Sequence, residues 1–284
     1  MLLSDFIREG RKALLALYPA PEAGNLMTRL FSARLGLPPH TPLVHPETEI
    51  PPASLDLLQD DLDRLLHGEP LQYVLGAATF CGRDFKVSPA VLIPRPETEL
   101  LVERALAAID GAGPGCRVLD LCTGSGCIAW TLMLERPGLC VTAVDLSGEA
   151  LAEARSQFPD RPAPHFVRAD VLTQPRIDGG PFHLIVSNPP YVLERQKAQM
   201  RRNVLDYEPE MALFVPDGNP LLFYRAIAGM ALTQLLPGGT GIVEINDALG
   251  PDTADIFIQA GFSDVSLLPD LSGRDRFIQF QRPF

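Results

Sequence analysis

The sequence predicts an α/β fold, in which helices cover one open, mostly parallel sheet and a small helical domain precedes it. Three observations support this expectation. Short apolar runs alternate with helical patterns after residue 116, as they do in strand–helix–strand units. A glycine turn joins the first of these runs to a helix. Residues 1–67, in contrast, contain leucine- and alanine-rich helical patterns. The 284 residues are enough for both domains.

The N-terminal helices are expected at residues 2–17 and 21–36, and in a third segment that ends at Gly68. Four leucines mark one face of this third helix: Leu55, Leu58, Leu62 and Leu65. We interpret this face as the core of a helical bundle, and the alternative is a groove for a partner. These helices predict an N-terminal domain at residues 1–71.

Residues 80–87 carry strand-forming residues on both sides of Gly82 and predict a hairpin, within a linker at residues 72–93. The larger domain, residues 94–284, is expected to begin with a helix over 96–109. Its seven strands are expected at residues 118–121, 141–144, 165–168, 182–186, 241–245, 265–268 and 277–280. Its later helices are expected at residues 128–135, 220–236 and 252–260.

A glycine turn follows the first expected strand. Gly124, Gly126 and Ala129 form the pattern Gly-x-Gly-x-x-Ala between a strand and a helix. Glycines let the backbone approach a ligand closely, and the helix N-terminus offers unpaired N–H groups. Asp145 ends the next strand, about 20 residues after Gly124, where a carboxylate can bind ribose hydroxyls. The alternative is that Asp145 is a turn residue before Ser147, the N-cap of the next helix.

The fourth expected strand ends in the tetrapeptide Asn188-Pro189-Pro190-Tyr191. A planar, conjugated nitrogen is a poor nucleophile, and a site helps by holding its N–H groups so that its lone pair faces the electrophile. The side-chain oxygen of Asn188 and the carbonyl of Pro189 can accept these N–H groups, and the prolines stiffen the backbone. Tyr191 supplies a flat apolar wall. The alternative is a proline-rich turn that only ends the strand.

Together the two motifs favour S-adenosylmethionine as the cofactor. A dinucleotide enzyme does not need Asn-Pro-Pro-Tyr, and a phosphate-binding loop needs Gly-Lys, which the chain lacks. Asp170 follows the third strand and is placed to accept a hydrogen bond from an adenine amine. All these residues lie at carboxyl ends of neighbouring strands, where open parallel sheets bind ligands. No metal site is expected, because the histidines and cysteines lack metal-ligand spacing.

The chain also resembles the HemK/PrmC family, methyltransferases that modify the glutamine of the Gly-Gly-Gln motif in peptide-chain release factors. The resemblance covers most of the chain and is carried by residues 68–73, 91–99, 120–128, 187–191, 207–209 and 273–276. It implies a Rossmann-like, seven-stranded S-adenosylmethionine-dependent methyltransferase with a substrate-recognising helical domain. The cofactor contacts are then expected at Cys122, Thr123, Gly124, Ser125, Gly126, Asp145, Asp170, Val171 and Asn188. The target glutamine is expected to be held by Asn188, Pro189, Pro190 and Tyr191.

Two positions depart from the family pattern. Val171 stands where many relatives carry an aromatic residue against adenine, and Ile245 replaces the usual glycine after Glu244. The glycine turn also resembles a sister family that methylates a glutamine of a large-subunit ribosomal protein, whereas residues 93–99 favour the release-factor branch. A further alternative is an N6-adenine methyltransferase of DNA or RNA, in which a flipped base stacks on Tyr191.

Composition limits the partners. The net charge of −11 argues against a protein held on bare nucleic acid. The five cysteines form no Cys-x-x-Cys pair and predict buried thiols in a reducing compartment. No apolar run reaches the length of a membrane span, and the N-terminus does not resemble a signal peptide. The resemblance implies that the protein partner is a release factor, and we expect a cytoplasmic monomer with no membrane partner and no stable nucleic-acid binding.

The connection at residues 192–219 is long for one that joins a strand to a helix, and it carries four basic residues: Arg195, Lys197, Arg201 and Arg202. Long connections inside compact domains are commonly lids or binding loops. The alternative is a solvated basic helix face.

Overall fold

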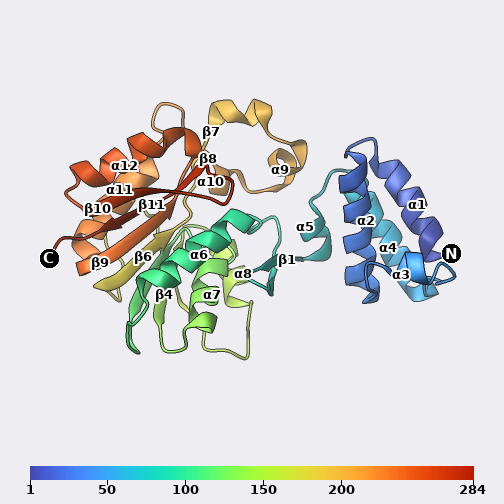
Figure 1. The fold of residues 1–284 in the computed structure, drawn as a ribbon, viewed down its shortest axis with the longest axis horizontal. Helices are drawn as coiled ribbons and strands as arrows, with labels where there is room; N and C mark the ends of the chain where they lie inside the picture. Colours follow the sequence, from blue (N-terminus) through green and yellow to red (C-terminus); the bar gives the residue numbers. More distant parts are fainter. The chain divides into compact units, whose positions relative to one another are not determined.

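Five helices form the N-terminal part of the computed structural model, which describes the whole chain, residues 1–284 (Figure 1). They are α1 (Leu3–Leu14), α2 (Ala20–Leu35), α3 (Thr41–Val44), α4 (Pro52–Leu66) and α5 (Leu71–Leu75). Met1–Ala77 and Arg201–Tyr207 make up one compact unit, and Ala78–Met200 and Glu208–Phe284 make up a second. The functional division at residues 71 and 93 stays a prediction. None of the helices combines the length and apolarity that crossing a membrane requires.

The first unit has a hydrophobic core of its own, to which α1, α2, α4 and α5 contribute. Leu58 and Leu65 of the predicted stripe in α4 are buried in this core, and Leu55 and Leu62 are partly buried and pack against it. The interpretation of that stripe as a bundle core is therefore confirmed. Arg34 of α2 pairs with buried Asp61 of α4 at 2.6 Å and also donates to the carbonyl of Val74 at 2.8 Å, so one guanidinium joins three helices.

A distant segment, α9 (Arg202–Tyr207), belongs to the same unit. Arg201 pairs with Glu22 of α2 at 2.6 Å, and the Tyr207 hydroxyl donates to the carbonyl of His67 at 3.1 Å. The rest of the connection predicted at residues 192–219 belongs to the second unit. It contains β7 (Val192–Leu193), η1 (Glu194–Gln199), α10 (Glu210–Leu213) and β8 (Phe214–Val215).

The predicted hairpin is formed by β1 (Ala77–Phe80) and β2 (Arg83–Lys86). Its turn places Cys81 at φ 47° and Gly82 at φ 70°, in the left-handed region that glycine adopts without strain. Phe80 and Phe85 are fully buried, and Phe85 meets Phe158 edge to face at 5.3 Å between ring centroids. The hairpin thus packs as part of the second unit.

A seven-stranded sheet with the order β10-β11-β9-β6-β3-β4-β5 is the base of the second unit. The strands are β3 (Arg117–Leu121), β4 (Cys140–Asp145), β5 (His165–Arg168), β6 (Phe182–Ser187), β9 (Leu235–Glu244), β10 (Ser263–Pro269) and β11 (Asp275–Gln281). β11 runs antiparallel to both neighbours, whereas β9, β6, β3, β4 and β5 are parallel. Each predicted strand overlaps an observed one, and the predicted fold class is confirmed. Because the strand order reverses between β3 and β6, a switch point lies at their carboxyl ends.

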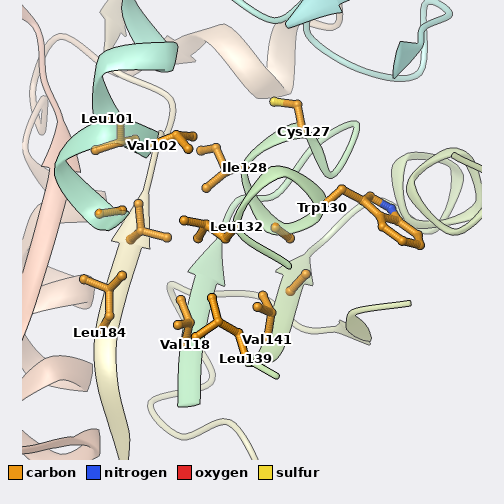
Figure 2. Close-up of a cluster of buried hydrophobic side chains, with 14 of the residues drawn as sticks. Leu101, Val102, Val118, Cys127, Ile128, Trp130, Leu132, Leu139, Val141 and Leu184 are labelled. Carbon is orange, nitrogen blue, oxygen red and sulfur yellow. The ribbon is translucent and has the colours of Figure 1, made fainter. Parts of the chain in front are cut away.

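Helices cover both faces of the sheet. On one face α6 (Pro96–Ala108), α7 (Cys127–Glu135) and α8 (Gly148–Arg155) share a core with Val118 and Leu184. Figure 2 shows side chains of α6 and α7 packed toward these strand residues. On the other face α11 (Leu222–Gln234) and α12 (Gly250–Gln259) share a second core with Leu119 and Ile185. Burial of alternate residues on opposite faces explains why these strands are continuous apolar runs in the sequence.

Candidate active site

A pocket of about 1060 Å³, counted with its open mouth, is lined by residues that follow β3, β4, β5 and β6. This is the switch point of the sheet, where ligands bind in open α/β folds. Nine of the predicted site residues line it: Cys122, Thr123, Gly124, Ser125, Asp145, Asp170, Val171, Asn188 and Pro190. Gly126, Pro189 and Tyr191 are not part of the lining.

The glycine turn forms one side of the pocket. Gly124 has φ 54°, and a Cβ added there would meet no atom within 4 Å, so this position faces open space. Gly126 has φ 78°, but a Cβ there would lie 3.0 Å from the Cβ of Ala154 and 3.1 Å from Trp130. Because Gly124 has no side chain, the space beside the turn stays open to the pocket. Gly126 allows α7 to pack closely against α8, and its contact with the cofactor stays a prediction.

Asp145 forms the turn contacts that the sequence offered as the alternative, and its binding of ribose hydroxyls stays a prediction. Its Oδ2 accepts from the backbone N–H of Gly124 and its Oδ1 from that of Ser147, each at 2.9 Å. The Ser147 hydroxyl in turn accepts from Ala150 and caps α8. Burial raises the pKa of Asp145, and the backbone hydrogen bonds oppose that shift. Each carboxylate oxygen keeps a lone pair, so Asp145 can anchor the turn and also accept from a ligand.

Asp170 and Val171 lie in the wall formed after β5. The Asp170 oxygens accept from the backbone N–H of Leu172 at 2.9 Å and from the hydroxyl of Thr173 at 3.1 Å. These bonds fix the carboxylate in a local turn. Val171 is buried and contributes an apolar surface to this wall.

The tetrapeptide after β6 divides between the pocket and the protein interior. Asn188 and Pro190 line the pocket. Tyr191 packs against the core on the α11 side, and its backbone carbonyl accepts from the side chain of Asn246 at 3.0 Å. The tyrosine ring therefore lies behind the pocket lining, and the prediction that it packs against the acceptor stays a prediction.

A buried carboxylate, Glu244, lies next to this end of the pocket. The hydroxyls of Thr98 and Tyr191 donate to its two oxygens at 2.8 and 2.9 Å, and the side-chain nitrogen of Asn188 donates to Thr98 at 3.1 Å. Burial raises the pKa of Glu244, while these two hydroxyls and Arg276 oppose the shift. Burial and the Glu244 charge also raise the pKa of Tyr191, which keeps its hydroxyl protonated as a donor.

Sequence reasoning missed part of the wall. The additional lining residues include Pro94, Arg95, Thr98, Pro209, Met211, Ala212 and Phe223. Glu208 is buried and ties two of these segments together, because it accepts from Arg95 at 2.6 Å and from the backbone N–H of Ile93 at 3.2 Å. The available signal was residues 91–99 and 207–209, which carried the family resemblance but were given no role.

The pocket fits an adenosyl cofactor. The bare turn at Gly124 leaves room for a ligand, and Asp145 offers acceptors for ribose hydroxyls. Val91, Leu146 and Val171 supply apolar surfaces for a flat base. At the other end Asn188 offers a polar contact for a second molecule. This arrangement suits a reaction that joins a nucleoside-containing donor to a polar acceptor.

Known proteins similar to this chain were identified by sequence and structure. Residues 5–76 match the model of the PrmC N-terminal domain, and residues 96–208 match that of the methyltransferase small domain. A release factor glutamine methyltransferase of Bacteroides thetaiotaomicron is 41% identical, over 96% of this chain and 97% of the relative. A release factor glutamine methyltransferase of Flavobacterium psychrophilum is 34% identical, over 98% of this chain and 99% of the relative. A similar solved structure is that of the release factor-specific protein-(glutamine-N5) methyltransferase of Alicyclobacillus acidocaldarius. It is 33% identical with a TM-score of 0.45, and the match covers 70% of this chain and 100% of that one.

The sheet order and the pocket at its switch point agree with the match to the methyltransferase small domain. This chain is therefore a methyltransferase of the seven-stranded α/β class. The relatives specify it further, since they match nearly its whole length. The chain belongs to the family of release factor glutamine methyltransferases.

Proposed function

We propose that this protein transfers the methyl group of S-adenosylmethionine to the side-chain amide nitrogen, N5, of the glutamine in the Gly-Gly-Gln motif of a release factor. One observation carries the proposal: Gly124, Asp145 and Asn188 line a single pocket in a chain of this family. The cofactor supplies an electrophilic methyl group on a sulfonium, which leaves as a neutral thioether. The glutamine nitrogen forms the new bond to the methyl carbon and then releases one of its two protons to solvent.

The chain itself mainly aligns the reactants. Gly124 and Asp145 hold the donor at one end of the pocket. Asn188 receives the glutamine at the other end, where an amide N–H bonded to its side-chain oxygen leaves the nitrogen lone pair free to face the methyl group. The prolines fix φ and keep the carbonyl of Pro189 in one direction. Cys122 and residues 123–125 complete the donor side.

The helical unit supplies recognition of the protein substrate. Its five N-terminal helices contain none of the predicted site residues, and it has its own core. A pocket that fits one glutamine accepts any exposed glutamine of suitable shape, so selectivity for a folded release factor requires binding energy from a second surface. We assign that surface to the domain at residues 1–71, with the linker at 72–93.

The test is to incubate the purified protein with isotope-labelled cofactor and, separately, a release factor, a large-subunit ribosomal protein and single-stranded DNA. Label in the release factor alone is the expected result. Label mainly in the ribosomal protein, or in adenine of the DNA, assigns one of the two alternatives considered from the sequence and overturns the proposal. Asn188→Ala serves as the control for contaminating activity, because it should lose at least about 10²-fold in turnover.

A further inference from the structure

Three polar side chains from distant parts of the chain form a connected series that runs inward from the acceptor end of the pocket. Thr98 belongs to the first turn of α6, Glu244 ends β9, and Asn188 follows β6. Thr98 is 2% exposed and Glu244 is 1% exposed, so water does not compete for their hydrogen bonds. The bonds run from Asn188 to Thr98 at 3.1 Å and from Thr98 to Glu244 at 2.8 Å.

The direction of each hydrogen bond in this series follows from the number of hydrogens that each group can donate. Both oxygens of Glu244 accept, because they take the hydroxyl hydrogens of Thr98 and Tyr191. A threonine hydroxyl has one hydrogen, so the side of Thr98 that faces Asn188 carries only lone pairs. The Asn188 amide must then present its NH₂ group to Thr98, because its oxygen in that place would meet another acceptor.

We propose that Thr98 and Glu244 are positioning residues that fix the amide of Asn188 in one orientation, with its oxygen directed to the methyl acceptor. This inference rests on the function proposed above. The fixed orientation of the Asn188 amide makes the acceptor end selective, since its oxygen binds the N–H of a glutamine amide and repels the carboxylate of a glutamate. With the amide turned over, the NH₂ group would face the glutamine nitrogen and could not hold its N–H.

Two substitutions of Thr98 separate the hydroxyl from the volume of the side chain. Thr98→Val keeps the shape and removes the hydroxyl, so kcat should fall about tenfold or more, less than the ~10²-fold typical of a lost direct contact. The affinity for S-adenosylmethionine, measured by titration calorimetry, should not change. Thr98→Ser keeps the hydroxyl and should restore kcat to within about threefold of the wild type. Thr98→Ala, which introduces no new atoms, replaces Thr98→Val if that variant does not fold.

A double-mutant cycle decides whether Thr98 acts through Asn188. In the Asn188→Ala background, Thr98→Val should cause no further loss of kcat. The proposal is overturned if Thr98→Val matches the wild type, if its loss adds fully to that of Asn188→Ala, or if Thr98→Ser is as impaired as Thr98→Val.

An NMR measurement tests the hydrogen bond between Asn188 and Thr98 without depending on the proposed function. The side-chain ¹⁵N–H₂ signal of Asn188 is identified by its absence in Asn188→Ala. It should shift in Thr98→Val and stay near its wild-type position in Thr98→Ser. A wild type without turnover on any release factor contradicts the proposed function, and the same signal still tests the bond. An unchanged signal in Thr98→Val would overturn the inference.

Discussion

Asp145 supports the glycine turn of the pocket and remains able to accept a hydrogen bond from a ligand. Two backbone N–H groups fix its carboxylate at 2.9 Å, which holds the glycine turn in place, and lone pairs remain on both oxygens. The pattern in the sequence was enough to find this residue, because strand, glycine turn and acid follow one another at characteristic spacing.

Asp145→Ala should weaken binding of S-adenosylmethionine by about 1.5–3 kcal/mol, since it removes hydrogen bonds to a charged acceptor. Titration calorimetry measures the effect. Asp160→Ala, an exposed acid outside the pocket, is the matched control and should bind normally. Equal affinity in the two variants would remove Asp145 from the cofactor site.

Asp120 predicts a pH dependence of stability. Burial raises its pKa to about 7 from the ordinary 3.8, although the Thr123 hydroxyl, at 2.5 Å, acts in the opposite direction. The folded state therefore holds a proton that the unfolded state releases near pH 4, and this contribution to stability is lost as the pH rises through 7. Between pH 5 and 7 the free energy of unfolding should fall relative to Asp120→Asn, by up to about 1.4 kcal/mol per pH unit.

Trp130 makes this measurement selective. It is the single tryptophan of the chain and is fully buried in the second unit, so its fluorescence in urea reports the unfolding of that unit. Parallel pH profiles for the wild type and Asp120→Asn would contradict the assignment.

Residues that act across long sequence separations are those that sequence reasoning missed. Thr98 and Glu244 are 146 positions apart, and Arg95 and Glu208 are 113 apart. No periodicity or spacing rule relates such positions, because only the folded sheet brings them together. The resemblance over residues 91–99 indicated that the segment matters without indicating a contact.

At the level of elements, the strands and the two layers of helices were predictable because buried strands are continuous apolar runs bounded by turns. Residues 192–219 were harder to predict. Their elements are only 2 to 6 residues long. Their basic residues are largely paired, Lys197 with Glu210 and Arg202 with Asp206. The part that lines the pocket, Pro209 to Ala212, carries no basic side chain.

The hairpin of β1 and β2 is joined to the glycine turn by Gln157. This buried side chain accepts from the backbone N–H of Lys86 at 2.8 Å and donates to the carbonyls of Lys86 at 2.9 Å and Ser125 at 3.2 Å. An element outside the sheet therefore supports the residues that hold the donor.

Gln157→Ala should lower the free energy of unfolding of the second unit by about 1–3 kcal/mol, because it leaves buried backbone groups unpaired. Lys86→Ala removes an exposed side chain and its surface hydrogen bond to the carbonyl of Ser156 at 2.8 Å, and should stay within about 0.5 kcal/mol of the wild type. Urea unfolding followed by Trp130 fluorescence compares the two. A loss no larger in Gln157→Ala than in Lys86→Ala would show that Gln157 does not stabilise this junction.

For the whole molecule, the main feature is that each unit has its own hydrophobic core. Family models match the two parts separately, at residues 5–76 and 96–208. The sequence predicts a division at residues 71 and 93 from helical patterns before Gly68 and a hairpin after it, and that division stays a prediction. Sequence patterns could not show that Arg201–Tyr207 belongs to the first unit, since its contacts with Glu22 and His67 span 179 and 140 positions of the chain.

Deleting residues 1–67 should leave binding of S-adenosylmethionine largely intact and should strongly reduce methylation of a folded release factor. Methylation of a short Gly-Gly-Gln peptide should fall much less, because the peptide needs only the pocket. The deletion also removes the partners of Arg201 and Tyr207, so Trp130 fluorescence must first confirm a folded second unit. Equal activity of the truncated and full chains on both substrates would contradict the recognition role.

In the proposed reaction, this pocket methylates a glutamine amide of a release factor. Fragment mass spectrometry of a release factor incubated with the enzyme and S-adenosylmethionine can locate the added methyl group. We expect one methyl group on the glutamine of the Gly-Gly-Gln motif, on its side-chain nitrogen, and none when Asn188→Ala replaces the wild type. A methyl group on another residue, or an unmodified release factor after incubation with active enzyme, would contradict the proposed reaction.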